Sequence, residues 1–218
     1  DAPISDADFP FMQCGAVGVH GVKGRLFRIS FSGEHAYEIA VPAAYGDALY
    51  RDLVARAEAL GGGGYGMEAL NVLRIEKGFI THAEIDGRIS ADDIGMGRMV
   101  SDKKDCIGKL ASTRPGLWGS ERGQMVGLKP VGEVKQLTAG AHLYQTGAAH
   151  IRENGQGYVT SVGFSPTFGS YLGLGFLRNG RARHGEVVEM VDALREVRAR
   201  VEICDPVFFD PTGGRVRG

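Results

Sequence analysis

Near the start of the chain, Phe27, Ile29 and Phe31 alternate with polar residues. A period of two is typical of a half-buried strand, so we expect these three apolar side chains to share the buried face. Arg28 would then lie on the opposite, wetter face.

The alternation resumes over residues 37–41, after the turn-forming residues 32–35. Two strand-like runs on either side of a short polar turn predict a β-hairpin. On its second strand, Glu38 would lie on the face opposite Tyr37 and Ile39.

Two later segments have a helical period. In residues 43–60 the apolar residues recur at helical spacing, at Leu49, Leu53, Ala57 and Leu60. This spacing predicts an amphipathic helix that packs on the sheet. A second helix is predicted from about Tyr65 to Lys77, where Gly78 ends it.

The segment 113–124 is rich in charged and helix-breaking residues, as domain boundaries often are. Six short strand-like runs follow it, at 124–130, 140–147, 158–166, 170–178, 185–191 and 195–204. Regularly spaced short strands favour a small antiparallel barrel or sandwich. We therefore predict an α+β protein with two parts, residues 1–116 and a barrel domain at 117–218.

Composition narrows the possible functions. The 218 residues carry a formal net charge of −1, which gives no reason to expect nucleic acid or an anionic membrane as a partner. The three cysteines, Cys14, Cys106 and Cys204, are far apart, so we expect free thiols in a reducing compartment, the cytoplasm.

No run of apolar residues approaches the roughly 20 that are needed to span a bilayer. The first residues lack the basic and apolar regions of a signal peptide and lead directly into a hydrophobic segment. We therefore expect this chain to be the C-terminal part of a longer polypeptide.

The glycine-punctuated loop 78–97 is rich in acids, but it lacks the ligand spacing of an EF-hand. Asp92 and Asp93 are candidates to cap a short helix that follows them. The glycine run 61–64 lacks the Lys-Ser/Thr of a phosphate-binding loop, and the histidines have no metal-ligand spacing. No catalytic residue or metal ligand can be assigned from these patterns.

Several motifs do carry a resemblance. The stretches YGMEALNVLRIEKGFI, DDIGMGRMVS, KDCIGK and DPVFFDPTGGRVRG are similar to the C-terminal region of alpha subunits of heterotetrameric sarcosine oxidases. That region belongs to the wider aminomethyltransferase family, the glycine-cleavage T-protein-like folate-binding proteins. The resemblance covers nearly the whole chain, and it implies half of a folate-binding domain followed by a C-terminal barrel.

The family's folate site is expected at three positions. SGEHAYEI resembles the family segment whose second glutamate binds the pteridine ring, which implies this role for Glu38, with Tyr37 beside it. The chemistry agrees, since a carboxylate can accept both adjacent N–H groups of a pteridine edge. The LR-x-E segment implies a supporting role for Arg74. From the residues alone, a solvated glutamate and a buried structural arginine remain open alternatives.

The resemblance implies oxidative demethylation of sarcosine, with transfer of the one-carbon unit to tetrahydrofolate as 5,10-methylenetetrahydrofolate. Flavin and NAD would bind elsewhere in a larger oxidoreductase, with beta, gamma and delta subunits as partners. This part alone would be inactive, because the family's aspartate near the reacting nitrogens precedes the matching segment.

Three other functions remain open at this stage. The motifs are shared with dimethylglycine-dehydrogenase-like enzymes and with stand-alone aminomethyltransferases. A non-catalytic folate-binding or assembly module has the same sequence features without turnover.

Overall fold

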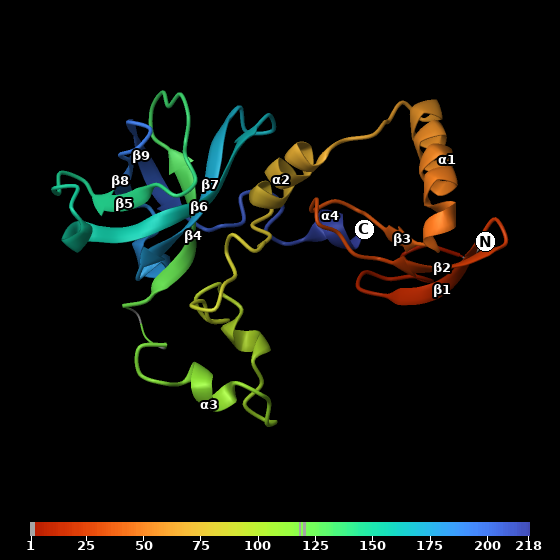
Figure 1. Ribbon diagram of the computed structural model, residues 1–218, viewed down its shortest axis with the longest axis horizontal. Helices are drawn as coiled ribbons and strands as arrows, with labels where there is room; N and C mark the ends of the chain where they lie inside the picture. Colours follow the sequence, from red (N-terminus) through yellow and green to blue (C-terminus); the bar gives the residue numbers. More distant parts are fainter. Residues whose placement is uncertain (1–2, 118, 120) are drawn as a thin grey trace. The chain divides into compact units, whose positions relative to one another are not determined.

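The computed structural model describes residues 3–117, 119 and 121–218 and divides the chain into two compact units. The first comprises the residues up to Arg74 together with Asp210–Gly218, and the second comprises Ile75–Phe209. Figure 1 shows the elements of both units along the chain.

The first unit contains a three-stranded antiparallel sheet in the order β1-β2-β3. Its elements are β1 (Cys14–Val19), β2 (Val22–Phe27), β3 (Glu38–Ala40), η1 (Ala43–Tyr45), α1 (Gly46–Ala59), the first part of α2 (Met67–Glu76) and α4 (Gly214–Arg217). β2 and β3 pair antiparallel across the connection 28–37, which confirms the predicted hairpin.

The phase of the predicted strand is wrong. β2 ends at Phe27, and its most buried residue is Leu26. Arg28, which was expected on the wetter face, is fully buried, whereas Phe31 is exposed. Alternation in the sequence marks two faces, but it does not say which face the rest of the fold covers.

The helix α1 confirms the predicted helical segment, but its expected packing is not observed. None of its residues is buried in the described chain, and Leu53 is 43% exposed. Leu60, just beyond its end, is 89% exposed. The helical period identified an apolar stripe correctly, although the described residues do not bury it.

The second unit is built on a closed barrel with the strand order β4-β7-β6-β5-β8-β9. Its strands are β4 (Gly123–Pro130), β5 (His142–Gln145), β6 (Gly155–Ser165), β7 (Ser170–Arg178), β8 (Val187–Asp192) and β9 (Val197–Cys204). The short helices η2 (Gly97–Met99) and α3 (Lys109–Ser112) precede β4, whereas η3 (Arg152–Asn154) connects β5 to β6 and η4 (Gly180–Arg183) connects β7 to β8. All strand pairs are antiparallel, and all six predicted strands are present.

The interior of the barrel is packed with apolar side chains from every strand. The buried members of this core are Val126, Leu128, Leu137, Ala141, Leu143, Val159, Leu177, Val188, Met190, Ala199, Val201 and Ile203. β6 and β7 approach closely, since a Cβ at Gly175 would lie 2.6 Å from the carbonyl oxygen of Tyr158. The barrel interior is therefore solid core, and ligands must bind outside it.

A second apolar cluster lies on the outer side of the barrel. Ile75, at the end of α2, packs there with Leu172, Leu174 and Phe176 of β7. The loop after α2 adds Ile80, Ile89 and Ile94, which are partly buried in the same cluster. Residues 75–94 thus pack with the barrel as one unit, an association that the sequence pattern did not predict.

Candidate functional site

Glu38 opens the short strand β3, and its side chain is exposed. It pairs across the sheet with Phe27, while Ile39 pairs with Leu26 and faces the opposite side. Among the described residues, the Glu38 carboxylate has no hydrogen bond or ion pair with another side chain. A carboxylate in this position can accept two hydrogen bonds from a planar donor edge.

The connection between β2 and β3 is held by the buried guanidinium of Arg28. This side chain donates to Asp6 Oδ1 at 3.1 Å and to the carbonyl oxygens of Val216 at 3.1 Å and Arg217 at 3.3 Å. Its Nη2 also lies 3.0 Å from His35 Nδ1. Because Arg28 bonds both ends of the unit and the connection itself, it fixes the backbone that leads into β3.

Tyr37 belongs to the same cluster. Its hydroxyl donates to the carbonyl oxygen of Ile4 at 2.8 Å and lies 3.1 Å from His35 Nε2. The guanidinium carbon of Arg28 lies 5.1 Å from the centroid of its ring, within the range of a cation–π interaction. Tyr37 and Glu38 are neighbours in the chain, but the Tyr37 side chain contacts His35, Ile4 and Arg28 of this cluster.

Sequence reasoning missed Arg28 and its partners. An arginine that alternates with apolar residues is an ordinary polar-face position, so the local pattern gave no sign of its burial. The partners at positions 6, 35 and 216 are up to 188 residues away in the chain, so only the fold brings them together.

Arg74 and Glu76 are both buried, each 3% exposed. Arg74 Nε donates to Asn71 Oδ1 at 2.9 Å within α2. Glu76 Oε1 accepts from Ser165 Oγ at 2.5 Å, on the barrel side of the boundary between the units. Glu76 therefore anchors the end of α2 to β6.

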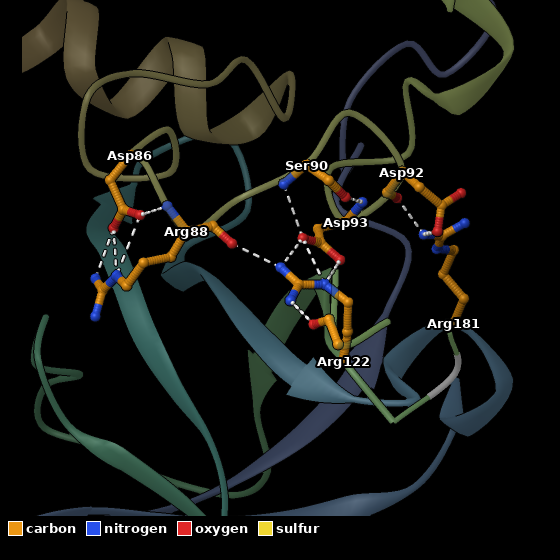
Figure 2. A network of polar contacts seen from close by, with 8 residues as sticks. Asp86, Arg88, Ser90, Asp92, Asp93, Arg122 and Arg181 are labelled. Carbon is orange, nitrogen blue, oxygen red and sulfur yellow. Dashed lines mark hydrogen bonds and ion pairs between the residues drawn. The ribbon is translucent and has the colours of Figure 1, made fainter. Parts of the chain in front are cut away.

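The acidic loop is organised by arginines rather than by helix caps (Figure 2). The side chain of Asp93 is only 2% exposed and accepts from Arg122 Nε at 2.9 Å and from the Ser90 backbone at 2.8 Å. Burial alone would raise the pKa of Asp93, but the hydrogen bonds from Arg122 and Ser90 hold it below the ordinary value.

Two further ion pairs complete this network. Asp92 pairs with Arg181 of η4, and Asp86 forms an exposed pair with Arg88 at 2.6 Å (Figure 2). The predicted capping role of Asp92 and Asp93 is wrong, because the next short helix, η2, begins after Met96 without a side-chain cap.

A cavity of about 890 Å³ lies in the second unit, beside this network. Apolar groups including Phe79, Ile94 and Met125 share its lining with the cationic side chains of Arg98 and Arg181. The lining also contains the acids Asp92 and Asp205, and Arg181 is paired with Asp92, so side chains of both charges face the cavity.

The cysteines are free thiols, as predicted. Cys14 and Cys106 are exposed, whereas burial raises the pKa of Cys204 to about 11. Within residues 3–117, 119 and 121–218, no group of three or more His, Cys, Asp or Glu residues could hold a metal ion. Over the same residues, no helix is both long and apolar enough to cross a bilayer.

Comparison with known proteins agrees with this architecture. The model of the GCVT N-terminal domain matches residues 1–104, and that of the glycine cleavage T-protein C-terminal barrel domain matches residues 124–210. A crystal structure of the glycine cleavage system aminomethyltransferase T from Bartonella henselae superimposes with a TM-score of 0.75. It covers 94% of this chain and 54% of that one at 24% identity, which shows the fold alone.

Among curated proteins, the chain is 46% identical to sarcosine oxidase subunit alpha of Rhizobium meliloti and 37% identical to that of Corynebacterium sp. (strain P-1). Both matches cover 99% of the chain but only 22% of the relative's length. An aminomethyltransferase of Halothermothrix orenii is 29% identical over 83% of the chain and 49% of its own length. The chain therefore belongs to the glycine cleavage T-protein family and is homologous to a segment of sarcosine oxidase alpha subunits.

Proposed function

We propose that this chain is the tetrahydrofolate-binding part of a sarcosine oxidase of the multi-subunit type. The larger enzyme would be cytoplasmic, would contain beta, gamma and delta subunits, and would bind flavin and NAD outside this chain. When bound, tetrahydrofolate supplies the nitrogens that accept the one-carbon unit removed from sarcosine, giving 5,10-methylenetetrahydrofolate.

The observation that carries this proposal is the exposed, unengaged carboxylate of Glu38 on a rigidly held strand. The residues present fit a pteridine, because a planar edge with two adjacent N–H donors matches the two oxygens of one carboxylate. The buried Arg28 fixes the approach to β3, so the backbone that carries Glu38 is positioned before the ligand arrives. Preorganisation of this kind lowers the cost of binding.

Tyr37 and Arg74 complete the proposed set of residues. Tyr37 supports the site through its contacts with Arg28 and the Ile4 carbonyl, which hold the start of β3. Arg74 is buried in α2 and would act as a supporting residue. The contribution of these residues to the reaction is orientation, and positioning two reactants is itself a large source of acceleration.

The proposal can be tested in the native protein by measuring how the one-carbon unit is divided between free formaldehyde and 5,10-methylenetetrahydrofolate. Sarcosine and tetrahydrofolate are supplied together, and both free formaldehyde and 5,10-methylenetetrahydrofolate are measured. Glu38→Gln should lower the folate product and raise free formaldehyde, while sarcosine oxidation continues at the same rate. An unchanged partition would refute the role of Glu38, and a native protein without sarcosine turnover would refute the proposed enzyme.

A further inference from the structure

The strand register places three side chains in one row across the sheet of the first unit. Cys14 of β1 pairs with Phe27 of β2, and Phe27 pairs in turn with Glu38 of β3. Residues that oppose each other directly in antiparallel strands point to the same face. The row spans two strand spacings, about 10 Å, which is long enough for a fused two-ring heterocycle.

This face of the sheet is accessible to solvent along the row. Cys14 and Glu38 are exposed, and Phe27 is partly exposed between them. The next row along the same face is Ala16–Arg25–Ala40, in which the exposed side chain of Arg25 lies beside Phe27 and between two short side chains. The opposite face differs, because it carries the buried Leu26 and is partly covered at Gly15 by the ring of Phe9.

We propose that Phe27 is the stacking residue of the folate site and that the bound pteridine lies across the row Cys14–Phe27–Glu38. The carboxylate of Glu38 would engage the N–H edge of the ring, while the phenyl group of Phe27, one strand away, contacts its face. The stacking of an aromatic ring on a heterocycle of this kind depends little on the substituents of the heterocycle. Cys14 then lies at the far end of the same ligand.

This inference rests on the proposed function and adds to it a residue that recognises the ring. Phe27 is a binding residue, and its removal should raise the Kd without abolishing the chemistry of a bound folate. From the effect of truncating aromatic side chains that stack on nucleobases, Phe27→Ala should weaken reduced-folate binding by roughly 5- to 150-fold. Phe27→Tyr keeps the ring and should bind within a few-fold of wild type.

The position of Cys14 allows a test on the unmodified protein. The native protein is treated with iodoacetamide, with and without saturating 5-formyltetrahydrofolate, and alkylation of each cysteine is followed by peptide mass spectrometry. Folate should slow the alkylation of Cys14 several-fold. Cys106 is also exposed but lies in the second unit outside this row, so its rate should not change.

The outcomes separate this inference from the proposed function. Protection of Cys14 together with weaker binding by Phe27→Ala and near-normal binding by Phe27→Tyr supports the row as the site. If folate binds and Glu38→Gln weakens it, but Cys14 is unprotected or fails to react even without folate, the stacking proposal is overturned while the proposed function stands. If 5-formyltetrahydrofolate does not bind the native protein at all, the stacking proposal and the proposed function are both refuted.

Discussion

The pair Asp93–Arg122 offers the sharpest test of how the acidic loop is held on the barrel. The substitution Asp93→Asn preserves the size of the side chain but removes its charge. Asp93 is 2% exposed and Arg122 is 19% exposed, so the change leaves a largely buried guanidinium without its anionic partner. Loss of one member of a buried ion pair costs about 3–5 kcal/mol.

We take the lower end, about 3 kcal/mol, because Arg122 keeps two other acceptors. Its Nη1 donates to the Gly116 carbonyl oxygen at 2.7 Å and its Nη2 to that of Arg88 at 2.6 Å. With a urea dependence of about 2 kcal/mol per molar, the unfolding midpoint should fall by about 1.5 M, as measured by far-UV circular dichroism.

Asp86→Asn is the matched control. Asp86 belongs to the same loop and also pairs with an arginine, but both partners of that pair are exposed (Figure 2). Its removal should leave the unfolding midpoint unchanged within experimental error. Equal midpoints for wild type and Asp93→Asn, or an equal loss in both variants, would refute the argument from burial.

The same pair predicts a dependence on pH. The pKa of Asp93 is lower in the folded protein than its ordinary value, so the carboxylate contributes stability that is fully present above about pH 4. That contribution is lost as the pH falls through the lower, folded-state pKa. The difference in unfolding free energy between wild type and Asp93→Asn should therefore shrink under acidic conditions, and a difference that grows would contradict the sign.

Three other predictions concern single groups. Glu84→Gln replaces a carboxylate that accepts from Ser161 Oγ at 2.5 Å, and it should lower the unfolding free energy by about 1–3 kcal/mol in urea titrations; no loss would show that the bond is dispensable. Arg28→Lys keeps the charge, but a lysine cannot reach all the acceptors of the guanidinium, so the unfolding free energy in urea should fall by about 2–3 kcal/mol. An unchanged unfolding free energy would mean that the Arg28 cluster contributes little to stability. Because its pKa is about 11, the Cys204 thiol should react with a disulfide reagent at pH 8 much more slowly than Cys14, and equal rates would contradict its burial.

The sequence predicted the barrel well because each strand carries its own local signal. All six runs of apolar residues between turn signals became strands, and the two helical periods became α1 and α2. These elements depend on neighbours two to four positions apart, which a sequence displays directly.

The predictions from sequence were wrong for residues whose hydrogen-bond partners are far away in the chain. Arg28 looked like a solvent-facing strand residue, because its acceptor at Val216 lies 188 positions away. Asp93 looked like a helix cap, because Arg122, 29 positions away, gave no local sign of its role. For the candidate site, the motif resemblance indicated Glu38, but only the strand register placed Phe27 and Cys14 beside it.

The most direct test of the central claim is the affinity of the native protein for a reduced folate, measured by titration calorimetry with 5-formyltetrahydrofolate. Glu38→Gln should weaken binding by about 1–3 kcal/mol, because one pteridine donor is left unpaired or faces an amide N–H group. Glu58→Gln, an exposed glutamate on α1 in the same unit, should bind like wild type. Equal affinities for wild type and Glu38→Gln would contradict the assignment of the folate site to this sheet.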